Sequence, residues 1–267
     1  MTSLSLFALL AACGGDDTKD TAGTSDTSGW SDTSDTTDTS DTTDTTDTSD
    51  TDMPAMSSVR VLHLSPDAPA VDVYVDDMAA PVLTDLAFGA GTGYAELPAG
   101  QHRFRIAPAD TSASSAVIDV APTLAADAKY TAVAVGRVAS IEPLLLADDA
   151  SGLDSAKLRV QVVHAAAAVG QVDIWEVSGP TPMLLLENVD FGAHAVLPDL
   201  PAGAYTVGID ATDDGVPDLV FSLPNLPGGL FVNLFAVSNA ANEAYLVAQL
   251  PDGTVAPIAP NGPVPAR

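Results

Sequence analysis

The segment 210–218 combines side chains and spacing that could hold a metal ion. It reads Asp-Ala-Thr-Asp-Asp-Gly-Val-Pro-Asp, so oxygen-bearing side chains recur at Asp210, Thr212, Asp214 and Asp218. Calcium takes about six to eight oxygen ligands, and alternate side chains on a tight loop supply them while a glycine allows a sharp bend. The sequence therefore predicts a calcium site formed by these four residues.

A plain turn is the competing interpretation of the same segment. Thr212 stands where calcium loops usually carry Asp, and Phe221 occupies the twelfth position, where an EF-hand has a glutamate. The corresponding segment 107–112 in the first half of the chain lacks these carboxylates. Because Asp and Gly also favour turns by themselves, an acidic hairpin loop between two strands fits the pattern as well.

The common sequence motifs of catalytic sites are missing from the sequence. It contains no Gly-x-Ser-x-Gly elbow, no His-Glu-x-x-His pair and no phosphate-binding glycine loop. His63 and His164 recur at equivalent places, each at the end of an apolar segment. A histidine bonded to backbone explains them most simply, and a ligand or general base is the alternative. We therefore predict that the chain is not an enzyme.

Cys13 is the single cysteine, which excludes a disulfide framework and a cysteine-rich zinc site. The apolar run 4–12 before it is shorter than the ~20 residues of a membrane-spanning helix and is typical of a signal peptide. No Lys or Arg precedes it, which departs from the usual signal pattern. Leu10-Ala11-Ala12-Cys13 resembles the bacterial lipobox, which implies cleavage after residue 12 and lipidation of Cys13. We expect a membrane-anchored protein at the bacterial outer membrane or cell surface.

Residues 13–55 form a predicted tether that begins with the lipidated cysteine. Asp recurs at every third position from 32 to 50, with Thr and Ser between. Such a segment has too little apolar surface to fold, and its like charges extend it, so we expect disorder. The whole chain has 9 basic and 36 acidic residues, a net charge of −27. That balance argues against nucleic-acid binding, which needs clustered Lys and Arg.

The rest of the chain contains an internal repeat. Val59-Arg60-Val61-Leu62-His63 matches 160–164, and Val71-Asp72-Val73-Tyr74 matches 172–175, both at a spacing of 101 residues. Phe-Gly-Ala at 88–90 and Leu-Pro-Ala-Gly at 97–100 recur 103 residues later. The repeat predicts two structural units, at residues 56–150 and 156–260, joined near a polar turn at 148–152.

Short β-rich segments punctuated by Gly and Pro fill both units, and no long amphipathic helix is indicated. The segment 71–75 alternates apolar Val71, Val73 and Val75 with Asp72 and Tyr74. This pattern is typical of a strand with one buried face. The expected strands cover residues 59–64, 71–75, 102–107, 117–120, 130–135 and 141–146, then 158–163, 172–177, 205–209, 219–223, 230–237 and 244–250. The predicted fold is therefore all-β, with two tandem immunoglobulin-like or transthyretin-like β-sandwich domains after a disordered acidic tether.

The stretch Arg60-Val61-Leu62-His63-Leu64-Ser65-Pro66-Asp67-Ala68-Pro69-Ala70-Val71-Asp72-Val73-Tyr74-Val75 resembles the family called domain of unknown function 4397. The later segments 97–100 and 130–136 fit the same pattern, whereas 165–170 departs from it in the second unit. The resemblance implies tandem β-sandwiches in a bacterial envelope or secreted protein, and it implies no activity.

Together these patterns predict a non-enzymatic bacterial cell-envelope lipoprotein that displays two β-sandwich domains for adhesion, matrix contact or a structural role. The alternative is a surface carbohydrate-binding module or hydrolase. Expected partners are the membrane, through the lipid anchor, and a glycan or an extracellular matrix protein. On half-buried strands, Asp72 and Asp173 are expected to face solvent, and Tyr74 and Trp175 would form the glycan-stacking surface if they point outward beside them.

Overall fold

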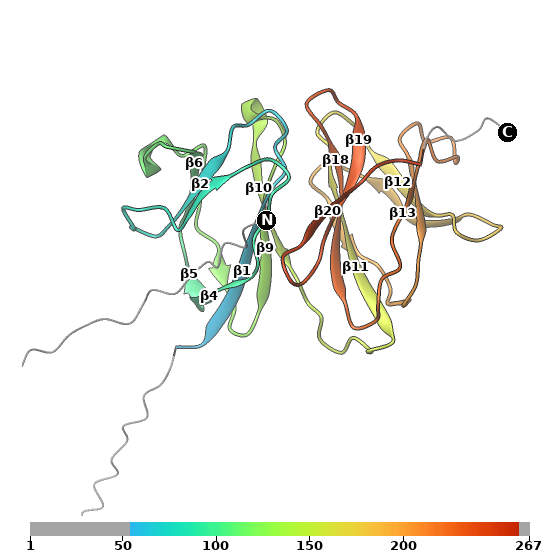
Figure 1. Ribbon diagram of the computed structural model, residues 1–267, viewed down its shortest axis with the longest axis horizontal. Coiled ribbons are helices and arrows are strands. Elements are labelled where there is room, and N and C mark those ends of the chain that lie inside the picture. The colour runs from blue at the N-terminus through green and yellow to red at the C-terminus, as the bar shows by residue number, and fades with distance from the viewer. Residues whose placement is uncertain (1–53, 262–267) are drawn as a thin grey trace, which may run out of the picture. The chain divides into compact units, whose positions relative to one another are not determined.

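The computed structural model describes residues 54–261, which belong to one compact unit. The predicted signal peptide at 1–12, the lipidation site Cys13 and the tether as far as residue 53 lie outside the described residues. Figure 1 shows strands joined by loops and turns. Within 54–261 the helical segments are two 3-10 turns, η1 (Ala113–Ser115) and η2 (Val138–Ser140). None of the helical segments in that range is long and apolar enough to cross a membrane.

The first half of the described chain, the first sandwich, has two main sheets in the orders β10-β9-β1-β4 and β3-β2-β6-β7, and a small sheet β5-β8. The pair β1–β9 is parallel. The strands are β1 (Met56–His63), β2 (Val71–Val75), β3 (Leu83–Leu86), β4 (Ala95–Pro98), β5 (Gly100–Gln101), β6 (Phe104–Pro108), β7 (Ile118–Val120), β8 (Thr123–Leu124), β9 (Lys129–Val135) and β10 (Glu142–Ala147).

The second half, the second sandwich, repeats this plan with one extension. Its sheets have the orders β14-β11-β18-β19-β20 and β13-β12-β16-β17, β15 pairs with β11, and β11–β18 is parallel. The strands are β11 (Lys157–Ala165), β12 (Val172–Glu176), β13 (Met183–Val189), β14 (His194–Val196), β15 (Leu200–Pro201), β16 (Thr206–Asp210), β17 (Leu219–Ser222), β18 (Phe231–Ser238), β19 (Ala244–Gln249) and β20 (Val255–Ile258).

The all-β prediction is confirmed, and each strand expected from the sequence coincides with an observed strand to within about three residues at either end. Val71 and Val73 face one core cluster and Val75 faces the next, as their alternation predicted. The independent folding of 56–150 and 156–260 stays a prediction.

The expectation that Asp72 and Asp173 face solvent is wrong, because both are buried. The Asp72 carboxylate accepts the backbone N–H groups of Asp85 and Asp110, at 2.9 and 3.2 Å. Asp173 accepts the N–H of Asn188 at 2.7 Å. The three donors all have positive φ angles, 55°, 61° and 54°, so each aspartate stabilises a bulge or turn that a non-glycine residue seldom adopts.

Tyr74 does not form the outward aromatic surface that the sequence suggested. Its side chain is buried, and its hydroxyl donates a hydrogen bond to the carbonyl of Thr111 at 2.7 Å. Trp175, at the equivalent place in β12, is only half-buried. The two aromatic side chains therefore present no matched pair of exposed rings.

A separate apolar cluster joins the two sandwiches, in addition to the three clusters that form their internal cores. It contains Leu62, Leu64, Val133, Val135 and Leu146 from the first sandwich with Val163, Ala165, Phe235, Val237 and Val247 from the second. These side chains come from β1 and the residue that follows it, β9 and β10 on one side, and from β11, β18 and β19 on the other. The inner sheets of the two sandwiches therefore share a buried interface.

Candidate functional site

The structure places the four predicted calcium ligands on the turn between β16 and β17. Asp210 ends β16, and its carboxylate accepts the backbone N–H groups of Thr212, Asp213 and Gly215 at 2.8 to 3.0 Å. Burial alone would raise the pKa of Asp210, but these backbone donors together outweigh it and lower the pKa. Its oxygens are thus engaged in holding the turn.

The other three residues of the loop also contact their own backbone or one another. Asp214 accepts the N–H of Val216 at 2.9 Å, and Asp218 accepts the N–H of Ala211 at 2.8 Å. The Thr212 hydroxyl lies 3.3 Å from an oxygen of Asp210 and of Asp218. Within residues 54–261, no group of three or more His, Cys, Asp or Glu side chains is arranged to hold a metal ion. Calcium binding by this loop stays a prediction.

The two repeated histidines occupy matching buried positions. The Nε2 atom of His63 lies 3.2 Å from the carbonyl of Pro69, and that of His164 lies 2.7 Å from the carbonyl of Gly170. Each ring also meets a phenylalanine edge-on, Phe88 or Phe191. Burial lowers the pKa of both histidines, although the backbone contacts partly oppose it. Each side chain therefore anchors the loop that follows β1 or β11.

His63 and Asp67 have separate partners and form no catalytic pair. The carboxylate of Asp67 accepts the backbone N–H of Val138 at 2.9 Å and lies 3.5 Å from Arg137. These contacts connect the loop after β1 to η2. The arrangement joins two loops at one end of the first sandwich.

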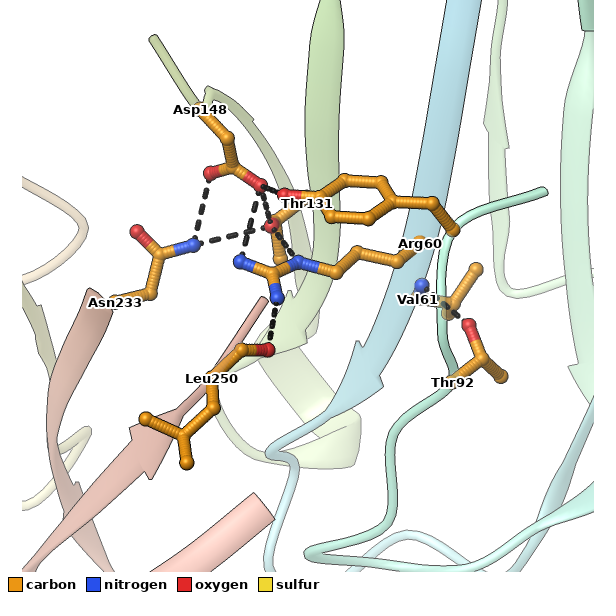
Figure 2. A network of polar contacts seen from close by, with 8 residues as sticks. Arg60, Val61, Thr92, Thr131, Asp148, Asn233 and Leu250 are labelled. Atoms are coloured by element: carbon orange, nitrogen blue, oxygen red, sulfur yellow. Dashed lines mark hydrogen bonds and ion pairs between the residues drawn. The ribbon is translucent and has the colours of Figure 1, made fainter. Parts of the chain in front are cut away.

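A buried polar network lies at the interface between the sandwiches, and sequence reasoning missed it. Arg60 on β1 is fully buried; its Nη2 lies 3.1 Å from Asp148, and its Nε donates to the Thr131 hydroxyl at 2.7 Å. Asn233 on β18 reaches across from the second sandwich and donates to Asp148 and Thr131 at 2.8 and 3.0 Å. Figure 2 shows these contacts converging on the Asp148 carboxylate.

Two further groups complete this network. Arg60 also donates to the carbonyl of Leu250 in the second sandwich, and its guanidinium lies 4.6 Å above the ring of Tyr94. The Tyr94 hydroxyl donates to Asp148, and burial, followed by this contact, raises the pKa of Tyr94. The ion pair is thus enclosed by donors and acceptors from both sandwiches, the condition under which a buried charge is tolerated.

The first sandwich also contains an apolar cavity of about 380 Å³ between its two sheets. It is lined by side chains of β1, β2, β6, β7, β9 and β10, among them Val61, Val73, Ile106, Ala132 and Leu145. The corresponding spaces in the second sandwich are about 50 and 20 Å³. The first volume lies within the range of about 300 to 1,000 Å³ that is typical of ligand pockets.

Exposed residues mark where this cavity meets solvent. Pro143 and Leu145 on β10 and Ala121 after β7 line it and are exposed. Both β7 and β10 are the last strands of their sheets. The cavity therefore opens between two sheet edges.

Comparison with known families gives a match that includes the first of the two sandwiches. Residues 57–175 match a family described as a domain of unknown function, DUF4397. This span begins at the second residue of β1, covers the remaining strands of the first sandwich and continues through β11 into β12. The resemblance noted in the sequence is confirmed for that span.

The other comparisons add little. No curated protein matches the chain. Among solved structures, the Bacillus anthracis TIE protein aligns with 78% of this chain at 14% identity and a TM-score of 0.23. The aligned part spans 44% of that protein chain.

Proposed function

We propose that this chain, whose residues 57–175 match the DUF4397 family, is a non-enzymatic bacterial cell-envelope lipoprotein that presents two β-sandwiches in a fixed arrangement for adhesion or matrix contact. Cys13 supplies the lipid anchor, and the acidic segment that follows holds the sandwiches away from the membrane. The surface that they present binds a glycan or a matrix protein.

The buried network between the sandwiches is the observation that supports this proposal. Arg60, Asp148 and Asn233 come from three different strands or strand ends and meet without solvent. Separating the sandwiches would take Asn233 and the Leu250 carbonyl away from a buried ion pair. Hydrogen bonds to charged groups contribute about 1.5–3 kcal/mol each, so these contacts, together with the shared apolar cluster, favour the docked arrangement. An adhesive pair of domains benefits from this because its two outward faces keep one spacing and orientation.

Cells that produce the full chain test the proposal. We expect them to bind at least one member of a panel of immobilised glycans and matrix proteins more strongly than cells without the gene. The Cys13→Ser variant should be released into the medium, and the cells should lose binding. Equal binding with and without the gene, or cleavage of a panel member by the purified protein, would contradict the proposal.

A further inference from the structure

We propose that the cavity of the first sandwich is an acceptor for an extended segment of another protein chain, which adds as a strand to the outer edge of β10 and inserts apolar side chains at alternate positions. This inference is independent of adhesion and of the lipid anchor. It rests on a comparison of the two sandwiches, because the second one already contains such a strand.

Strand β20 occupies the equivalent place in the second sandwich. It pairs antiparallel with β19, with Ala256 opposite Ala248 and Ile258 opposite Leu246. Beyond β20, Asn261 donates its backbone N–H to the carbonyl of Val220 in β17 at 2.7 Å. The segment 255–261 therefore lies along the edges of both sheets and closes the gap between them.

The strand registers identify which residues correspond in the two sandwiches. Ala132 pairs with Val61 as Leu234 pairs with Val162. Leu145 in turn pairs with Ala132, as Ala248 pairs with Leu234. Leu145 is 36% exposed, whereas Ala248, covered by β20, is 7% exposed. Strand β10 is thus the counterpart of β19, and within residues 54–261 nothing pairs with its outer edge.

The missing strand is one cause of the cavity, and smaller side chains are the other. Ala132 stands where the second sandwich has Leu234, as shown above. Val73 pairs with Ile106 as Ile174 pairs with Ile209, so a valine that lines the cavity stands where the second sandwich has a buried isoleucine. Both reductions enlarge the space that the inserted side chains of an added strand would fill.

The outer edge of β10 offers backbone groups for such a strand. Asp148 donates its backbone N–H to Lys129 on β9, so in an antiparallel ladder the even-numbered residues of β10 face β9 and the odd-numbered ones face outward. Leu145 and Ala147 therefore present N–H and C=O groups, and Pro143 presents only its carbonyl. An exposed edge of this kind is a template for strand addition by another chain.

A peptide with the sequence of residues 253–261, Gly-Thr-Val-Ala-Pro-Ile-Ala-Pro-Asn, is the probe, because this segment fills the equivalent place. We expect saturable binding of the fluorescently labelled peptide to the full chain, measured by anisotropy. Amide hydrogen exchange at Leu145 and Ala147 should slow at least tenfold. A peptide with aspartate at the positions of Ala256 and Ile258 should not bind.

The decisive variant fills the cavity with the residues of the second sandwich. Ala132→Leu combined with Val73→Ile should keep the melting temperature at or above that of the wild type and reduce peptide binding at least tenfold. Equal binding by this variant, or no saturable binding by the wild type, would overturn the proposal.

Other occupants give different results. Peptides N-methylated at the amides that pair with β10 lose binding if a strand is added, and equal binding by them would overturn strand addition. A fluorescent fatty acid is the probe for a lipid. If it binds the cavity and displaces the peptide without slowing amide exchange in β10, the cavity is a lipid site and the proposal is overturned. If the wild type forms dimers and the filled variant does not, the cavity binds a second copy of the chain. That result would also overturn the proposal of a foreign partner.

Discussion

Arg60 and Asp148 carry opposite charges at a place from which water is excluded. Replacing Arg60 with Met should lower the free energy of unfolding by about 3–5 kcal/mol, because Asp148 would remain buried without its charged partner. Urea denaturation measures this. Arg103→Met is the matched control: its pair with Asp119 is about half exposed, so the loss of stability should be much smaller than for Arg60→Met. Equal losses in the two variants would contradict the role assigned to the buried pair.

Both buried histidines give the protein a pH dependence in a mildly acidic range. The folded state lowers the pKa of His63 and His164 from 6.5, so below about pH 6.5 protons bind the unfolded chain preferentially. Their contribution to stability is therefore present above pH 6.5 and decreases as the pH falls towards 5, by up to about 1.4 kcal/mol per pH unit for each histidine. Urea denaturation between pH 8 and 5 tests this. A variant with both histidines replaced by Gln should lose this slope, and its persistence would show that other groups cause it.

Most strands of the inner and outer sheets could be predicted from the sequence, including the edge strands β7, β10 and β17, but other edge strands could not. Strand β20 contains Pro257, which argues against a strand, and β13 is largely exposed and so lacks a clear buried face. The interface was missed for a different reason. Apolar residues on both faces of β1, β9, β11 and β18 indicate strands covered on both sides, yet alternation alone does not say what covers the second face.

The turn after β16 allows a prediction at the level of one element. Asp210→Ala should destabilise the second sandwich by about 1–3 kcal/mol, because three backbone N–H groups lose their acceptor. Asp214→Ala, which removes a single exposed contact, should cost less than about 1 kcal/mol. Chemical denaturation of both variants compares them, and a larger loss in Asp214→Ala would contradict this account of the turn.

The calcium site predicted for the same turn has its own test. Millimolar calcium should raise the melting temperature of the wild type, since a ligand that binds only the folded state stabilises it by mass action. Asp214→Ala should not respond. No shift in the wild type, or the same shift in the variant, would identify residues 210–218 as an ordinary acidic turn.

At the scale of the whole molecule, the interface predicts how the two sandwiches behave when they are separated. Fragments 54–150 and 156–261 should each show β-type circular dichroism, because each retains its own internal core. The ion pair stays within the first fragment, but Asn233 and the apolar half of the interface are lost from it. Mixed fragments should therefore associate, and Asn233→Leu in the second fragment should weaken this at least tenfold in analytical ultracentrifugation. Fragments that fold but never associate would contradict the shared interface.

The position of β1 has a mechanical consequence. Any pull transmitted through the chain before Pro54 enters the described fold at the first strand, and β1 lies between β4 and β9. Its parallel register with β9 extends from Ser58 to His63, so tension along β1 loads the hydrogen bonds of this ladder together in shear instead of opening them one after another. Arg60, in the middle of β1, is additionally held to Thr131 and to the Leu250 carbonyl. A protein held at its amino-terminal end against flow would thus resist extraction of its first strand through both sandwiches at once.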